Sequence, residues 1–271
     1  MDDSKHTLYL FIDNFKFSFI VGKNFDNSEY KIIFELDVPT LGIKDNRIID
    51  FEKTLNLIKE NLYLLEKKIN FTFKEIVLIL ENFEFSYINI TGFKKLNGSQ
   101  IIRENITYIL NSLKAYIDEM EPQKKVIHIF NSNFNLDNKK IENLPIGLFG
   151  DFYSHELSFA LMNKNNFKNY KNIFEKCNLK IKKTLLRSFI TGAHVSKKYK
   201  NLDTFFLIKI NKSNSNIFYF ENHSLKFEQN FKFGTDIVLS DISKVTSLNI
   251  NKIKDILSQN DLKKDIKEDE I

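Results

Sequence analysis

Residues 205–220, FFLIKINKSNSNIFYF, predict a strand, a tight turn and a second strand. Two apolar runs, 205–210 and 217–220, flank a polar segment of Asn, Lys and Ser at 211–216. Asn and Ser favour turns because their side chains hydrogen-bond to the nearby backbone. We therefore expect a β-hairpin here, and the elements around it decide the fold.

Sugar-kinase-like and actin-like folds bind the phosphates of ATP with a mid-chain hairpin of this kind, placed after a long helix. Their turns are rich in glycine, because only glycine lets successive backbone N–H groups close on a phosphate. The turn at 211–216 contains no glycine. The sequence therefore predicts the architecture of a phosphate-binding hairpin without its chemistry.

Length and composition narrow the class of protein. The chain has 271 residues, 42% of them hydrophobic, and a mean hydropathy of −0.29, which is typical of a soluble chain with a buried core. It has one Cys, an acidic N-terminus and no run of about 18 apolar residues. We therefore expect a cytoplasmic protein with no membrane-spanning helix, secretory leader or disulfide scaffold.

The net charge of +5 raises nucleic-acid binding as an alternative. Arg, whose fork reads base edges and phosphates, occurs only at Arg47, Arg103 and Arg187. The lysines are interleaved with Asp and Glu, and Lys, Asn, Ile and Phe all have A+T-rich codons. We therefore predict solvated charged faces and no nucleic-acid partner.

Hydrophobic patterning predicts a chain of mixed strands and helices. Residues 8–21 and 29–36 form the two strands of a hairpin, and Asp50 caps a long helix with apolar residues at three- and four-residue spacing. The run 75–80, EIVLIL, is a short strand buried on both faces. Further helices are expected at 167–177, 185–198, 233–248 and 250–257, and a charged, frayed tail at 262–271.

Residues 84–163 are predicted to form a unit of their own. It begins with a strand at 87–91 and a helix at 99–116, with Ile102, Ile106, Ile109, Leu110 and Leu113 turned inward. Strands at 125–130 and 156–162 follow, separated by a polar loop at 131–143 and the segment PIGLFG at 145–150. This order of strand, helix, strand and strand has the size of an inserted subdomain.

Several short motifs occur in an order and at a spacing that can be compared with known families. They are Pro39-Thr40-Leu41-Gly42 followed by Ile48-Ile49-Asp50; Val126-Ile127-His128, then Asp137, then PIGLFG at 145–150; FEKCNLKI at 174–181; and Gly234 with Ser240-Asp241-Ile242. In order and spacing, the chain resembles the FtsA family of actin-like bacterial cell-division proteins over essentially its whole length. The type IV pilus protein PilM shares this layout and is the nearest alternative.

The resemblance implies an α/β chain with the actin-like ATPase (ribonuclease H-like) fold and an inserted strand-helix-strand-strand subdomain. It assigns residues 1–83 and 164–200 to subdomain 1A, residues 84–163 to the inserted subdomain 1C, and residues 201–271 to part of subdomain 2A. Subdomain 2B, which in the family holds the dock for FtsZ, and the terminal membrane helix have no counterpart in the 271 residues.

The two phosphate loops that the resemblance implies are degenerate. The first has the family form Asp-Ile-Gly-Thr-Ser-Lys, and here Phe11 stands in place of the magnesium-associated carboxylate. The second loop loses an acid and three glycines, and a later family Asp falls on Asn216. The residues at the loop positions are Phe11, Asp13, Asn14, Lys16, Lys209, Asn211, Lys212, Ser213, Asn214 and Asn216. We therefore expect no ATP cofactor and no metal, and predict a pseudo-ATPase.

Individual residues allow alternatives. Asp13 is a substitute for the lost carboxylate or a simple turn former, and Lys209 and Lys212 are phosphate-binding charges or solvated turn residues. His128 lies in an apolar strand and is interpreted as a packing residue. Residues 86–91 with the Asn-rich segment 131–143 are a candidate partner surface in 1C.

The resemblance predicts a non-catalytic scaffold of the divisome, the bacterial cell-division machinery. Its expected partners are divisome proteins, including FtsZ or a second copy through 1C, and any membrane contact is peripheral and made through those partners. The chain would then act at the cytoplasmic face of the division site. The alternatives are a PilM-like scaffold of a pilus machine and a divergent ATPase that uses Asp13.

Overall fold

The computed structural model describes residues 6–24, 30–199 and 202–259. Its contacts divide the chain into two compact units, Met1–Phe205 with Tyr219–Phe227, and Phe206–Phe218 with Glu228–Ile271. The predicted frayed tail at 262–271 lies outside the described residues. The predicted boundaries of subdomains 1A, 1C and 2A stay a prediction.

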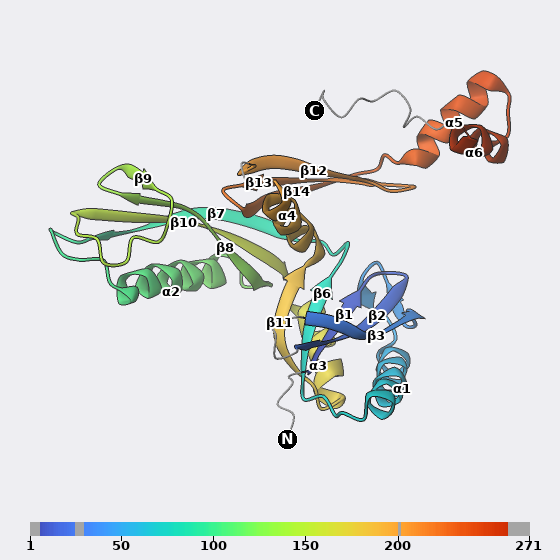
Figure 1. Cartoon of the computed structure of the whole chain (residues 1–271), viewed down its shortest axis with the longest axis horizontal. Coiled ribbons are helices and arrows are strands. Elements are labelled where there is room, and N and C mark those ends of the chain that lie inside the picture. Colours follow the sequence, from blue (N-terminus) through green and yellow to red (C-terminus); the bar gives the residue numbers. More distant parts are fainter. Residues whose placement is uncertain (1–5, 25–29, 200–201, 260–271) are drawn as a thin grey trace. The chain divides into compact units, whose positions relative to one another are not determined.

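A five-stranded sheet, in the order β11-β6-β1-β2-β3, organises the first unit (Figure 1). Its strands are β1 (His6–Ile12), β2 (Lys16–Asn24), β3 (Tyr30–Pro39), β6 (Glu75–Leu80) and β11 (Lys180–Leu186). β1, β2 and β3 are antiparallel, whereas β6 runs parallel to both β1 and β11. β6 has five successive buried residues, as its continuous apolar run predicts for a strand between two neighbours.

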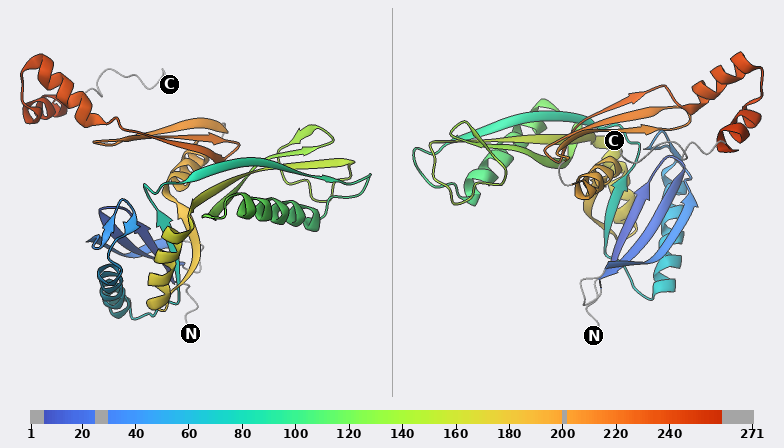
Figure 2. Two further views of the ribbon diagram at one scale, coloured as in Figure 1. Left: turned by 180° about the vertical axis from the view of Figure 1, so that it is seen from behind. Right: turned by 45° about the horizontal axis from the view of Figure 1, so that its top comes forward.

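Two helices, α1 (Phe51–Ile69) and α3 (Lys164–Lys176), share one apolar core with this sheet (Figures 1 and 2). The predicted cap of α1 is confirmed, because the Lys53 N–H donates to the Asp50 carboxylate at 3.1 Å. The predicted stripe is buried as well, from Leu55 through Ile58 and Leu62 to Leu65. α3 confirms the helix expected at 167–177 and begins three residues earlier.

The prediction of one long strand at 8–21 was wrong. A turn at residues 13–15 divides it into β1 and β2, so the N-terminal region is a three-stranded meander and not a hairpin. The Asp13 N–H donates to the Lys16 carbonyl at 3.2 Å, and the Asn14 N–H donates to the Asp13 carboxylate at 2.6 Å. Asp and Asn stabilise such turns because their side chains hydrogen-bond to the adjacent backbone.

Residues 86–163 form a four-stranded sheet in the order β7-β10-β8-β9 with α2 along one face (Figures 1 and 2). The elements are β7 (Ser86–Lys95), α2 (Arg103–Met120), β8 (Lys124–Leu136), β9 (Lys139–Ile141) and β10 (Phe152–Asn163). The expected strand-helix-strand-strand order is therefore confirmed, with β9 as an added short strand. Ile109 and Leu113 of α2 are buried against the sheet, together with Ile117.

Two details of this region differ from the prediction. Ile102 is 46% exposed, because α2 begins only at Arg103 and Ile101 takes the buried position. The segment 131–143 is not a loop, since β8 continues to Leu136 and turns into β9. Asp137 and Asn138 both have positive φ angles, which is the backbone of a tight hairpin turn.

The helix expected at 185–198 begins later than predicted, because β11 occupies its first residues. β11 pairs in parallel with β6, and α4 (Arg187–Lys198) follows it directly. The run KIKKTLL has too little continuous apolar character to reveal a strand, and its pairing partner lies about a hundred positions earlier in the sequence. Pairing with β6 therefore determines that residues 180–186 form a strand.

The hairpin at 205–220 is confirmed. β12 (Thr204–Ile210) and β13 (Ser215–Glu221) flank a turn at 211–214, and β14 (Ser224–Phe231), which the sequence did not reveal, completes a three-stranded sheet. The expected C-terminal helices are present as α5 (Thr235–Thr246) and α6 (Ile250–Gln259). Within the described ranges, no helix has the length and apolar character needed to cross a membrane.

Candidate functional site

The first phosphate-loop position is the turn between β1 and β2. Asp13 and Asn14 form the turn, and the Phe15 side chain is 80% exposed beside them. The Thr40 hydroxyl, just beyond β3, donates to the Asn14 carbonyl at 2.6 Å. The turn is therefore fastened to the sheet by a residue 26 positions away.

Two further asparagines bind this turn from other parts of the sequence. Asn46 lies in the tight turn between β4 (Ile43–Lys44) and β5 (Arg47–Ile48), and Asn82 follows β6. The Asn46 N–H donates to Asn14 Oδ1, Asn46 Nδ2 donates to the Asn82 carbonyl at 2.6 Å, and Asn82 Nδ2 donates to Asp13 Oδ1 at 3.2 Å. Asp13, Asn14, Asn46 and Asn82 thus form a closed set of hydrogen bonds, the asparagine ring.

The asparagine ring is attached to the core of the first unit. Asn46 is 4% exposed, and its carbonyl accepts from the Tyr170 hydroxyl and from Asn166 Nδ2, both at 3.2 Å, on α3. Asn46 and Asn82 adopt positive φ angles, which Asn tolerates better than other side chains. The sequence prediction missed both residues, although the Asp45-Asn46 pair is a recognisable turn signal.

The charged and aromatic residues of the first loop are also engaged. The Arg187 guanidinium lies 5.3 Å from the centre of the Phe11 ring, so a cation covers the position where the resemblance places a metal-binding carboxylate. Lys16 Nζ lies 2.5 Å from Asp37 Oδ2 on β3. The hydrogen bond from Lys16 holds the pKa of Asp37 below its usual range. Asp13 accepts hydrogen bonds from Asn14 and Asn82.

The second phosphate-loop position, residues 209–214, belongs to the other unit and is closed by its own residues. The Asn211 N–H donates to the Asn214 carbonyl at 2.9 Å, and Asn211 Nδ2 donates to Asn214 Oδ1 at 3.1 Å. Lys212 and Ser213 are exposed at the tip of the turn, whereas Asn216 on β13 is 4% exposed. The turn is thus a compact local structure.

The N-terminus of α5 completes this second turn. The backbone N–H groups of Thr235 and Asp236 donate to the carbonyls of Asn211 and Lys212 at 3.0 and 2.9 Å. Gly234 lies so close to this backbone that a Cβ atom would overlap the Lys212 carbonyl. N-terminal N–H groups of a helix are the natural donors to an anion, and the turn itself occupies two of them.

Other candidate residues have structural roles. His128 packs against Phe130 and Phe189, with ring centres 4.3 and 5.2 Å apart, and burial lowers its pKa, which confirms the packing interpretation. Cys177 ends α3, and burial raises the pKa of its thiol to about 11. The described part of the chain has no group of three or more His, Cys, Asp or Glu side chains placed to hold a metal ion.

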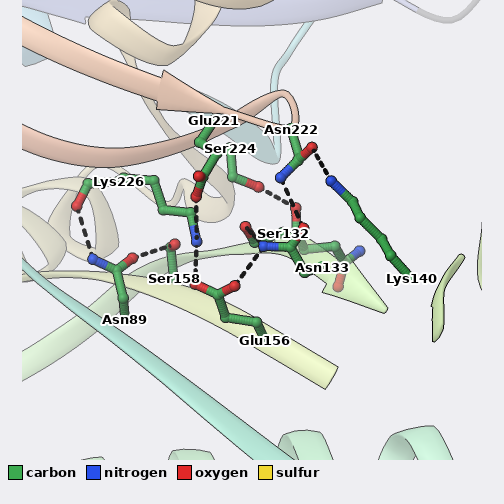
Figure 3. Close-up of polar contacts among 11 residues, drawn as sticks. Asn89, Ser132, Asn133, Lys140, Glu156, Ser158, Glu221, Asn222, Ser224 and Lys226 are labelled. Carbon is green, nitrogen blue, oxygen red and sulfur yellow. Dashed lines mark hydrogen bonds and ion pairs between the residues drawn. The ribbon is translucent and has the colours of Figure 1, made fainter. Parts of the chain in front are cut away.

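A buried ion pair contacts the segment predicted as a partner surface in 1C (Figure 3). Lys226 of β14 is 5% exposed, and its Nζ lies 2.5 Å from Glu156 Oε1 on β10 and 3.6 Å from Glu221 Oε2 on β13. Asn133 Nδ2 donates to Glu156 Oε2 at 2.5 Å. Burial raises the pKa of Glu156, but the hydrogen bonds from Lys226 and Asn133 outweigh it, so the pKa lies below its usual range.

More hydrogen bonds join the β13–β14 turn to the four-stranded sheet in the same view (Figure 3). Asn222 Nδ2 donates to Asn133 Oδ1 at 2.8 Å, Asn89 Nδ2 donates to the Lys226 carbonyl at 3.2 Å, and the Ser224 hydroxyl donates to the Asn131 carbonyl. We call these residues, with Glu156 and Glu221, the Lys226 cluster. Asn89, Asn131 and Asn133 of the expected partner surface thus make intramolecular contacts, which the sequence could not reveal because the partners lie far along the chain.

Comparisons with known proteins show similarity to one family in sequence. No family model matches the chain. The cell division protein FtsA of Buchnera aphidicola subsp. Schizaphis graminum is 20% identical over 224 residues, 83% of this chain and 53% of the relative. FtsA of Buchnera aphidicola subsp. Acyrthosiphon pisum is 20% identical over 255 residues, 94% of this chain and 60% of the relative. The chain thus spans about half to three fifths of the curated relatives it matches.

The fold is similar to that of a solved structure, the PilM-PilN type IV pilus biogenesis complex. The superposition has a TM-score of 0.55 at 10% identity and covers 92% of this chain and 68% of the other. At this identity the likeness concerns the fold alone. The chain therefore has the expected actin-like ATPase fold, and its sequence resembles the FtsA family as a divergent relative.

Proposed function

We propose that this chain is a non-catalytic scaffold of bacterial cell division that has kept an actin-like fold and lost nucleotide binding. The asparagine ring is the single observation that carries the proposal. It fills the first phosphate-loop position with hydrogen bonds between protein groups. A phosphate needs free donors and a cation in that place.

The first loop has the wrong chemistry for magnesium. Hard cations require oxygen ligands, and the position of the family carboxylate holds Phe11 under the Arg187 guanidinium. Asp13, the alternative carboxylate, already accepts from the Asn14 N–H and from Asn82 Nδ2. If the Asp13 carboxylate turned away to bind a metal ion, the Asn14 N–H and Asn82 Nδ2 would lose their acceptor. This cost opposes a catalytic role for Asp13.

The second loop supports the same proposal independently. Two N–H groups at the start of α5 donate to carbonyls of the turn, and Asn211 closes on Asn214. Phosphoryl transfer relies on a preorganised cradle of donors and a bridging metal ion, because the protein contributes little covalent chemistry. Lys212 at the tip provides a point charge but no such cradle.

A chain that does not turn over ATP would act by binding other proteins. Its similarity to FtsA favours partners in the divisome. We infer that the partners are proteins at the cytoplasmic face of the division site, including FtsZ or a second copy bound through the four-stranded sheet. Membrane contact would be peripheral and made through those partners.

Titration of the purified chain with Mg-ATP, followed by calorimetry, tests the loss of nucleotide binding. We expect no binding at micromolar nucleotide. The matched control is the double variant Asn211→Gly with Ser213→Gly, which removes two side chains from the second turn and leaves the α5 contacts in place. It should bind no better. Micromolar binding by the parent chain, or ATP turnover that disappears in Asp13→Ala, would overturn the non-catalytic proposal.

The structural likeness to PilM favours a second candidate, a scaffold of a type IV pilus machine. The position of a fluorescent fusion in dividing cells separates the two candidates. A mid-cell band that vanishes when FtsZ is depleted supports the divisome role. Polar foci that persist after FtsZ depletion support the pilus role. Diffuse fluorescence under both conditions contradicts both.

A further inference from the structure

A pocket of about 460 Å³ lies on the first unit beside the asparagine ring. Its walls are the β4–β5 hairpin, the two residues that follow Asn82, and the start of α3. Asn46 belongs to both the ring and the pocket. The volume falls in the range of about 300 to 1,000 Å³ that is usual for small-molecule sites.

Asn46 uses all of its polar groups except one. Its N–H donates to Asn14 Oδ1, its Nδ2 donates to the Asn82 carbonyl at 2.6 Å, and its own carbonyl accepts from two side chains of α3. The remaining group, Oδ1, is buried and has no hydrogen-bond partner among the described residues. A buried acceptor without a donor is costly, and Asn46 is only 4% exposed.

Asn166 on α3 shows the same pattern next to Asn46. Its N–H donates to Asn163 Oδ1 at 3.0 Å, and its Nδ2 donates to the Asn46 carbonyl at 3.2 Å. Its Oδ1 is also buried and lacks a partner in the part of the chain that the structure describes. Because each Nδ2 donates to a backbone carbonyl, the orientation of both amides is fixed, and both unpartnered atoms are acceptors. The pocket therefore needs a ligand that donates hydrogen bonds.

The charged side chains of the pocket are mixed in sign. Lys44 and Arg47 are directly opposite each other across the β4–β5 pair, where like charges repel. Asp45, in the turn between them, and Glu84 are the two carboxylates of the lining. All four side chains are exposed, and none forms an ion pair within residues 6–24, 30–199 and 202–259. A ligand with one acidic and one basic group would therefore find a partner for each.

We propose that this pocket binds a small zwitterion, an amino acid with an apolar side chain. Its ammonium group would donate to the amide oxygens of Asn46 and Asn166, which it reaches as the half-buried Asn166 side chain turns toward it. Its carboxylate would lie between Lys44 and Arg47 and relieve their repulsion.

The chemistry of the pocket favours a zwitterion over a phosphate or a metal ion. A phosphate group offers mainly acceptors, so it leaves the two amide oxygens without a donor. A metal ion would use these oxygens but would be repelled by Lys44 and Arg47. Phe83 and Ile49 provide an apolar wall, which suits a hydrocarbon side chain. The inference goes beyond the proposed function, because it holds for a cell-division scaffold and a pilus scaffold alike.

Calorimetric titration of the full chain with L-leucine tests the proposal, alongside three probes that each lack one feature. Isocaproate lacks the ammonium group, isoamylamine lacks the carboxylate, and L-serine lacks the apolar side chain. We expect L-leucine to bind, and each of the other probes to bind about tenfold more weakly or less. No binding at about 10 mM L-leucine, or a second probe that binds as tightly as L-leucine, would overturn the proposal.

A paired variant tests the carboxylate end of the ligand. Lys44→Gln with Arg47→Gln should weaken L-leucine binding by about tenfold and should not weaken the binding of isoamylamine, which has no carboxylate. The matched control is Lys59→Gln with Arg103→Gln, an exposed lysine and an exposed arginine outside the pocket, and it should bind L-leucine like the parent chain. Equal loss of L-leucine binding in both paired variants would overturn the assignment.

Asn166→Ala tests the ammonium end by removing one of the two unpartnered oxygens. The Asn46 carbonyl keeps the Tyr170 hydroxyl as a donor, so the variant should fold, which circular dichroism checks. It should weaken the binding of L-leucine and isoamylamine and leave that of isocaproate unchanged. Asn165→Ala, at the neighbouring exposed position, is the control and should bind all probes like the parent chain. Equal weakening of every probe by Asn166→Ala would indicate a purely structural role and overturn the proposal.

Discussion

The turns at the two predicted phosphate-loop positions are stabilised in different ways. The first turn is held by residues from distant parts of the sequence, since Thr40, Asn46 and Asn82 all bind it. The second turn is closed by Asn211 and Asn214, three positions apart, and by the start of α5. The first turn thus receives hydrogen bonds from three separate segments 26, 32 and 69 positions away. The second turn is closed by one residue three positions away and by a single further segment, the start of α5.

This difference has energetic consequences. The asparagine ring includes Asn46, which is 4% exposed, and removing one of its partners leaves a polar group without a hydrogen bond in a poorly solvated place. The contact between Asn211 and Asn214 is only partly buried, so water replaces it at a lower cost. Contacts like those of the asparagine ring should therefore stabilise the chain far more than contacts like the one between Asn211 and Asn214.

Lys226 provides the largest test of this comparison, because its contacts are both long-range and charged. In Lys226→Met, the Glu156 carboxylate stays three quarters buried without its cation, and we expect a loss of about 3–5 kcal/mol in the free energy of unfolding. Denaturant unfolding monitored by circular dichroism measures the loss. The double variant Lys226→Met with Glu156→Gln should recover most of it, and a single-variant loss below about 1 kcal/mol would contradict the comparison.

Gly234→Ala tests the closure of the second turn. The added Cβ meets the backbone carbonyl of Lys212, which cannot yield as a flexible side chain does, so α5 must move away. We expect a cost of about 1–3 kcal/mol and faster hydrogen exchange at the amides of Thr235 and Asp236. Ser213→Ala, at the exposed tip, is the matched control and should leave both amides protected. Unchanged exchange in Gly234→Ala would show that the helix does not depend on this contact.

Asn14→Ala and Asn214→Ala compare the two turns directly. Asn14→Ala leaves the N–H of Asn46, a residue only 4% exposed, without an acceptor, and should cost about 2 kcal/mol. Asn214→Ala removes a partly buried contact beside the exposed tip of the turn and should cost less, about 0.5 kcal/mol. Thermal unfolding of both variants measures the difference. Equal losses would mean that long-range and local closure stabilise the chain alike.

The pair of Lys16 and Asp37 gives the smallest expected effect, because both side chains are about half exposed. The hydrogen bond from Lys16 lowers the pKa of Asp37 in the folded state. Its contribution is therefore present above the pKa of an unfolded Asp and is lost as the pH falls through the lowered value. Asp37→Asn should flatten the acid side of the stability profile slightly, and high salt should remove the difference between parent and variant.

Much of the fold follows from local patterns that a sequence displays. The N-cap at Asp50 and the stripe from Leu55 to Leu65 depend on neighbours within one helix, and the hairpin at 205–220 depends on one short turn. These elements were predicted correctly because hydrogen bonding and hydrophobic periodicity over a few residues specify them.

The remaining features depend on which distant segments meet. β11 becomes a strand because β6 pairs with it, and Asn46 and Asn82 acquire their role because the turn at Asp13 lies within hydrogen-bond distance. The Lys226 cluster joins residues 70 positions apart. Propensity and spacing describe contacts within a few residues, whereas packing of the core brings these groups together. The sequence therefore predicts the loss of phosphate chemistry, and the folded chain shows which polar contacts close the two turns.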